Sequence, residues 1–319
     1  MRRFALLTAA LALLTAPSAL ADGLPVLGID VGSSGVTVPG SADRYVTVGG
    51  TGTGTTLVER IARNGGRIAQ LARVSGDFTI PAVAYDSSAS GLSADGTTLV
   101  LIEPRASFPR QVTRFLLLDA HTLRVRRTVT LRGDFSFDAV SPHGQRMFLI
   151  NYTSPNDPTR YTVRAYDFSV GALVPNPVRD PAKRSDKMRG SPITRTMSAD
   201  GRWAYTLYDG AGSTPFVHAL DTVALRAHCI DLPLLAGRRD LWALRLTRGS
   251  GNELRVATPG AVLARIDLTR FTVSTRAAEG TSSSLRGLEL VAAVVAALLL
   301  AALAAFATRR RFRGAPSPA

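Results

Sequence analysis

The sequence predicts an all-β fold made of repeated units, and the first observation behind this prediction is a recurring polar turn. Each turn runs directly into a short apolar segment, as in SADGTTLVLI from Ser93 and SADGRWAYTL from Ser198. Further turns of this kind begin at Ser41, Ser141 and Thr247, so the unit recurs at intervals of about 50 residues. Polar and apolar residues alternate within these segments, which is the period of a β-strand rather than of a helix.

The rest of the unit repeats more loosely around that turn. One strand is expected ahead of the turn in four units, over 78–85, 134–140, 191–197 and 241–247. A third strand then ends at an aspartate in four units, at Asp119, Asp167, Asp221 and Asp267. A carboxylate in this place can accept hydrogen bonds from the backbone of an Asx turn. We therefore interpret these aspartates as structural, and we expect a fourth strand after them, over 124–133 in the second unit.

Four antiparallel strands in a repeat of this length predict the blade of a β-propeller, in which radial packing covers the strand edges. The "SADG…LVLI" and "LDTVAL" elements resemble the repeats of YVTN and TolB-type propellers, distant relatives of the WD repeat, over roughly residues 34–276. This resemblance implies an extracytoplasmic binding or assembly module, and in some members an enzyme. We expect about five four-stranded blades, and residues 24–31 could supply one further strand.

The two ends of the chain predict export and a membrane anchor. Residues 1–21 have the basic start, apolar run and small-x-small end of a signal peptide. Residues 288–308 contain an unbroken apolar run, and such a helix is long enough to cross a bilayer. Because arginines concentrate on the cytoplasmic side, the basic tail 309–319 places the C-terminus inside. The sequence thus predicts a single-pass type I protein of the cell membrane, with a propeller over 22–276 outside the cytoplasm and a linker over 277–287.

The charge of the chain narrows the class of partner. The formal net charge is +14, and much of it belongs to the predicted exported part. Export excludes nucleic acid as an expected partner, so an anionic ligand, an envelope component or the membrane surface is favoured. The chain has a single cysteine, Cys229, so no intrachain disulfide is expected.

The long connections of the predicted propeller all fall on one side, which we call the long-loop side. It carries the connections between the second and third strands and between the fourth strand and the next blade, whereas tight turns occupy the opposite, tight-turn side. Long loops on a rigid scaffold are a common place for function. Guanidinium and ammonium groups there suit carboxylate or phosphate oxygens, and the candidate ligand-binding residues are Arg105, Arg110, Arg114, Arg160, Lys183, Arg184, Lys187 and Arg189. The alternative is a merely solvated basic surface.

No catalytic centre, metal site or cofactor site is expected, because the reactive side chains are spread over different parts of the repeats. Two other classes stay open. One is a propeller hydrolase or lactonase-like enzyme with its site on the long-loop side. That class would be favoured if two or more of His218, Asp209, Asp157 and Asp180 lay in one pocket. The other is a purely structural envelope protein.

Overall fold

The computed structural model describes residues 35–49, 53–62, 66–183 and 188–275. The chain divides into one unit of Met1–Val273 and a second of Ser274–Ala319, of which only the first two residues are described. The predicted signal peptide, linker, transmembrane helix and tail lie outside the described residues. Within those ranges, no helix is both long and apolar enough to span a membrane.

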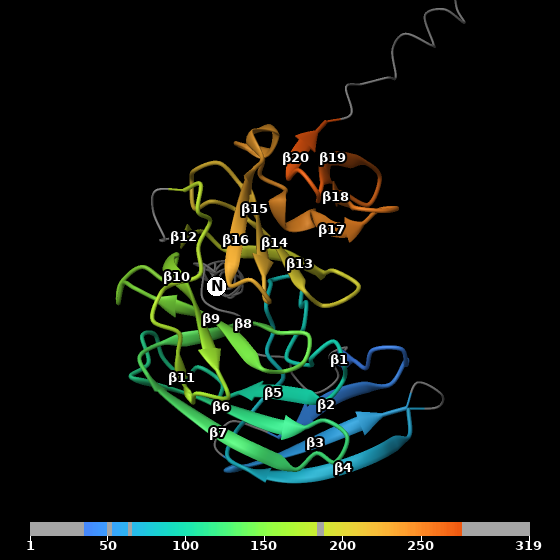
Figure 1. Ribbon diagram of the computed structural model, residues 1–319, viewed down its shortest axis with the longest axis vertical. Coiled ribbons are helices and arrows are strands. Elements are labelled where there is room, and N and C mark those ends of the chain that lie inside the picture. Colours follow the sequence, from blue (N-terminus) through green and yellow to red (C-terminus); the bar gives the residue numbers. More distant parts are fainter. Residues whose placement is uncertain (1–34, 50–52, 63–65, 184–187, 276–319) are drawn as a thin grey trace, which may run out of the picture. The chain divides into compact units, whose positions relative to one another are not determined.

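The prediction of an all-β fold is confirmed, because the described residues form five antiparallel sheets that follow the order of the sequence (Figure 1). The first sheet contains β1 (Val36–Thr37), β2 (Arg44–Val48), β3 (Thr55–Ile61) and β4 (Ile68–Ser75). The second contains β5 (Thr98–Ile102), β6 (Val112–Asp119) and β7 (Val125–Arg132). The third contains β8 (Phe135–Val140), β9 (Arg146–Tyr152), β10 (Arg160–Asp167), β11 (Ala172–Leu173) and β12 (Met188–Arg189).

The last two sheets have four strands each. The fourth sheet contains β13 (Pro192–Met197), β14 (Trp203–Tyr208), β15 (Phe216–Asp221) and β16 (Arg226–Asp231). The fifth contains β17 (Arg245–Arg248), β18 (Glu253–Ala257), β19 (Val262–Asp267) and β20 (Thr272–Ser274). Two short 3-10 helices join these sheets, η1 (Pro233–Leu235) and η2 (Leu241–Ala243). The number of blades in a closed propeller stays a prediction, because residues 24–31 lie outside the described part.

The predicted polar turns lie directly before the second strand of their sheets, except that the turn at Ser93 precedes β5, the first strand of the second sheet. At Ser93, Ser141 and Ser198 the serine hydroxyl holds the turn together. The Ser93 hydroxyl donates to Asp95 (2.6 Å) and accepts the Thr98 backbone N–H (3.0 Å). Ser198 repeats both contacts with Asp200 (2.5 Å) and with the Trp203 backbone N–H (2.8 Å). The repeated motif therefore encodes a hydrogen-bonded hairpin turn.

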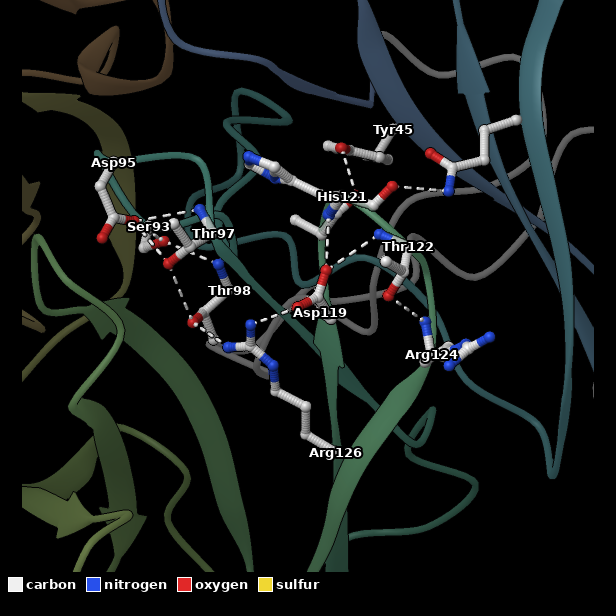
Figure 2. A network of polar contacts seen from close by, with 12 residues as sticks. Tyr45, Ser93, Asp95, Thr97, Thr98, Asp119, His121, Thr122, Arg124 and Arg126 are labelled. Carbon is white, nitrogen blue, oxygen red and sulfur yellow. Dashed lines mark hydrogen bonds and ion pairs between the residues drawn. The ribbon is translucent and has the colours of Figure 1, made fainter.

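The aspartates that end the third strands have the predicted structural role. Asp119 accepts the backbone N–H groups of His121 (3.0 Å) and Thr122 (2.9 Å), as Figure 2 shows. Arg126 reaches back from β7 to the same carboxylate and also donates to Thr98. Equivalent backbone contacts are made by Asp167, Asp221 and Asp267. These Asx turns close the third-to-fourth strand hairpins on the tight-turn side.

Neighbouring sheets pack face to face, because successive residues of a strand point to opposite faces. In β5, Leu99 and Leu101 join a cluster with the first sheet, whereas Val100 and Ile102 join a cluster with the third. Further buried clusters join the third sheet to the fourth and the fourth to the fifth. The second, third and fourth sheets are therefore buried between their neighbours in sequence, while in these clusters the first and fifth sheets each pack on one neighbour.

Two predicted strands need correction. The prediction over 241–247 holds only from Arg245, because Leu241–Ala243 form η2. The predicted strand 78–85 is wrong. Only isolated bridges connect this region to β5, at Thr79 and at Leu92, so the second sheet has three strands and not four. Proline at position 81 has no N–H to donate to a ladder. The residues between the bridges form a projecting hairpin, joined by the bridge Ala82↔Ala89, and the Tyr85 N–H at its tip donates to the Pro192 carbonyl of the fourth sheet (3.0 Å).

Candidate functional site

Two of the predicted ligand-binding arginines surround one buried carboxylate. The side chains of Arg105 and Asp134 are 4% and 2% exposed, and the Arg105 Nε donates to Asp134 Oδ1 (3.1 Å). The Arg110 backbone N–H donates to Asp134 Oδ2 (2.9 Å), while its guanidinium group donates to the Glu103 carbonyl (2.8 Å). Burial, and then the charge of Arg105, lower the pKa of Arg110 to about 10. These two arginines therefore fasten the 103–111 connection to the start of β8.

Four further predicted ligand-binding residues are described and exposed, Arg114, Arg160, Lys183 and Arg189, and three of them have carboxylate partners. Arg114 pairs with Glu103 (2.9 Å), Arg160 with Asp157 (3.0 Å) and Lys183 with Asp231 (2.8 Å). Arg189 lies opposite Arg160 in the pairing of β10 with β12, so these two are brought together. Arg184 and Lys187 lie outside the described residues. The predicted set is thus divided into a buried pair and exposed cations near acidic partners.

Of the four residues whose convergence would favour an enzyme, two meet in the interior. Asp180 accepts the Cys229 backbone N–H (2.8 Å), and Cys229 Sγ lies 3.8 Å from His218 Nδ1. Asp180 and His218 are 6% and 1% exposed. Burial lowers the pKa of His218 to about 4 and raises the pKa of Cys229 to about 12. Near neutral pH the pair is a thiol beside a neutral imidazole, which is not the ion pair of an activated nucleophile.

The remaining two carboxylates, those of Asp157 and Asp209, accept hydrogen bonds from backbone N–H groups. Asp157 accepts the Thr159 N–H (3.0 Å), and Asp209 accepts the Ser191 N–H (2.7 Å). In the described part of the chain, no group of three or more His, Cys, Asp or Glu residues is arranged to hold a metal ion. The described carboxylates of the long-loop side therefore stabilise loops.

A cleft that the sequence did not predict lies between the fourth and fifth sheets on the tight-turn side. Its volume is about 620 Å³, within the range of small-molecule sites. Residues from three turns and from β14, β17 and β18 line it: Ser198, Ala199, Asp200, Arg202, Trp203, Tyr205, Arg248, Gly251, Asn252, Glu253, Leu268 and Thr269. The cleft thus combines aromatic rings, charged groups and amide or hydroxyl groups.

An aromatic group forms one wall of this cleft. The Trp203 and Tyr205 rings are parallel within 5°, with centroids 6.2 Å apart. Phe271 packs on Trp203 at 5.4 Å, and the Arg202 guanidinium lies 5.7 Å from the Trp203 ring centroid. Trp203 occupies the position that holds Thr98 in the second unit and Arg146 in the third. This aromatic substitution next to a repeated turn was the signal in the sequence that could have located the cleft.

Comparisons with known proteins leave the family open. No protein-family description matches the sequence, and no curated protein matches it closely. Among solved structures, the chain is similar to a putative TolB from Agrobacterium tumefaciens, with 14% identity, a TM-score of 0.39 and coverage of 76% of this chain and 79% of that one. The β-propeller domain of Cps50 (Swd1) from Myceliophteria thermophila gives 14% identity, a TM-score of 0.40 and coverage of 75% and 64%.

Hydrazine synthase from Kuenenia stuttgartiensis gives 21% identity, a TM-score of 0.36 and coverage of 57% of this chain. The chain spans only 46% of that protein and 58% of the AztD protein from Citrobacter koseri. The similar structures thus include TolB-like and WD40-type propellers, as the sequence repeats indicated. Likeness at these TM-scores carries no information on ligands or partners.

Proposed function

We propose that the protein is a binding module, a β-propeller held outside the cytoplasm by one C-terminal membrane span, and that the cleft between the fourth and fifth sheets is its ligand site. The proposal rests on a contrast between the side chains of the long-loop side and those of the cleft. The reactive groups of the long-loop side are committed to loop and interior contacts, whereas the cleft is lined by side chains suited to recognition. A concave site with aromatic walls and a few polar groups is typical of small-molecule binding.

The anchor and topology are part of the same proposal and rest on the sequence. The apolar run within 288–308 and the arginines after it support a type I orientation. An anionic envelope component, bound on the long-loop side by Arg114, Arg160, Lys183 and Arg189, is a second candidate partner. That candidate is supported by the exposure of these four residues and weakened by their acidic neighbours.

Fluorescence offers a direct test, because the chain has only two tryptophans. In full-length Trp242→Phe protein, purified in detergent, Trp203 is the one remaining indole and reports on the cleft. We expect its emission to change saturably with a low-molecular-mass fraction of envelope extract. Filling the cleft with Thr269→Phe should abolish the response, while His121→Phe, at the equivalent position of the second sheet, should preserve it. An unchanged response in Thr269→Phe protein, or none in any fraction, would contradict the proposal.

A further inference from the structure

Two hydrogen-bond donors of the cleft have no acceptor in the described part of the chain. Tyr205 is 2% exposed and lines the cleft, yet its hydroxyl forms no hydrogen bond with a described residue. Arg248, at the end of β17, is exposed and forms no ion pair or hydrogen bond within the described ranges. Both donors line the cleft and are available to a ligand that brings an acceptor.

Tyr205 remains a donor at ordinary pH. Burial, and then the charges of Asp200 and Asp221, raise the pKa of its phenol to about 12, while Arg248 acts in the opposite direction. Both side chains line the same cleft. A phenol and a guanidinium group that line one cleft suit an oxyanion, because both donate and one carries the complementary charge.

The other charged groups of the cleft already have partners. Arg202 donates to both oxygens of Asp221, with Nε–Oδ1 3.0 Å and Nη2–Oδ2 2.6 Å. Glu253 Oε1 accepts from Arg255 (2.5 Å) and Arg265 (2.7 Å). The lining contains two cations and two carboxylates, and of its two cations only Arg248 forms no ion pair within the described ranges, so Arg248 is the group available to an anion.

The carboxylates that line the cleft oppose a doubly charged ligand. Asp200 and Glu253 both belong to the lining, and like charges nearby disfavour a phosphate dianion. The apolar part of a ligand would meet Trp203 and the half-buried Leu268. A carboxylic acid with a small apolar or aromatic body satisfies all of these groups together.

We propose that the cleft binds a small carboxylic acid, whose carboxylate accepts from Arg248 and the Tyr205 hydroxyl and whose body lies against Trp203 and Leu268. This inference rests on the proposed function of the same cleft and names its ligand class. Asn252 donates from its amide to Thr269 (3.2 Å) at the rim, where both groups can contact a polar substituent of the acid.

The test is a titration of full-length Trp242→Phe protein with phenylacetate, phenylacetamide and inorganic phosphate, followed by Trp203 emission. Phenylacetate should bind saturably, and at least about tenfold more tightly than the uncharged amide, which loses a charged hydrogen bond. It should also bind more tightly than phosphate, whose second charge the lining carboxylates disfavour and which has no apolar body to contact Trp203. Arg248→Gln and Tyr205→Phe should each weaken phenylacetate binding by about tenfold or more. Arg132→Gln, which removes an exposed arginine from β7, should leave it unchanged.

Equal affinity for phenylacetate and phenylacetamide, or unchanged binding in Arg248→Gln protein, would overturn the carboxylate assignment. A response of Trp203 to envelope fractions or to phosphate, but not to phenylacetate, would overturn it as well and would leave the cleft as a binding site for another ligand. Failure of the proposed function has a different signature, because Thr269→Phe would then leave every response of Trp203 unaltered.

Discussion

Arg195 of β13 and Asp138 of β8 form a buried ion pair that joins the fourth sheet to the third. Their side chains are 3% and 2% exposed, and Arg195 also donates from Nε to the Thr206 hydroxyl (2.7 Å). The two residues are 57 positions apart, so the contact depends on the packing of one repeat against the next. Asp138 lies at a bulge in the pairing of β8 with β9, which places its carboxylate off the regular alternation of the strand.

Removing the arginine alone should destabilise the protein strongly. Arg195→Met leaves a buried carboxylate without its cation, and we expect the free energy of unfolding to fall by about 3–5 kcal/mol. Denaturant unfolding of the full-length protein measures this change. The double variant Arg195→Met/Asp138→Leu should recover much of the loss, since neither charge remains. A single variant as stable as exposed Arg132→Met would show that the pair is not a buried link between sheets.

The projecting hairpin of residues 82–89 should be coupled to the start of the fifth sheet. Tyr85 at its tip meets Trp242 of η2 edge to face, with ring centroids 5.2 Å apart and an interplanar angle of 89°. A double-mutant cycle with Tyr85→Ala and Trp242→Ala should give a coupling of about 1 kcal/mol in unfolding free energy. Additive losses from the two substitutions would mean that the rings do not interact.

Acid should weaken the fold through the Asx turns. Backbone hydrogen bonds, and then Arg126, lower the pKa of Asp119 to about 2, and hydrogen bonding from Ser169 does the same for Asp167. Because these pKa values are lowered in the folded state, their stabilisation is present above about pH 4 and is lost as the pH falls toward 2.

The charge of these aspartates can be separated from their capping role. In Asp119→Asn/Asp167→Asn protein an amide oxygen still accepts from the backbone, but no proton is taken up in this range. The midpoint of thermal unfolding should therefore depend less on pH between 4 and 2 than in the parent protein. An identical pH dependence would assign the acid sensitivity to other groups.

The predicted basic surface can now be tested with the exposed residues alone. Replacing Arg114, Arg160, Lys183 and Arg189 by Gln should weaken association of the full-length protein with anionic liposomes or cell-wall polymer at low salt, and should reduce its salt dependence. A control with the same loss of charge replaces four arginines of the tight-turn side: Arg44, Arg67, Arg124 and Arg270. Equal weakening in both variants would show that association depends on the net charge of the protein and not on these four residues of the long-loop side.

The sequence predicted the repeated parts of the fold because their signals are local. A serine and an aspartate two residues apart specify a turn such as that at Ser93, and the alternation that follows specifies the strand. The hairpin at 82–89 was missed because its apolar residues alternate like those of a strand, although Pro81 interrupts the ladder. Its stability comes from contacts with Pro192 and Trp242, more than 100 positions away.

The candidate site was less accessible to sequence reasoning. Counting charges by loop placed Arg105 on a surface, whereas Asp134, 29 positions later, draws it into the interior. The cleft arises where the turns of two sheets leave space between them, and a single repeat contains no signal for that space. Which charges are available to a ligand depends on side-chain contacts between sheets. A single sequence does not show which residues make these contacts.

The most direct test of the central proposal, a binding cleft exposed outside the cell, is labelling of a cysteine at its rim. Cys229, the single cysteine of the chain, is replaced by alanine, and Ala199→Cys is introduced into the full-length protein. A membrane-impermeant maleimide should label this cysteine in intact cells, and envelope extract that changes Trp203 emission should slow the labelling. Ala319→Cys in the same background should react only after the cells are permeabilised. Labelling of Ala199→Cys only after permeabilisation, or at a rate that the extract does not change, would contradict the proposal of an exposed binding cleft.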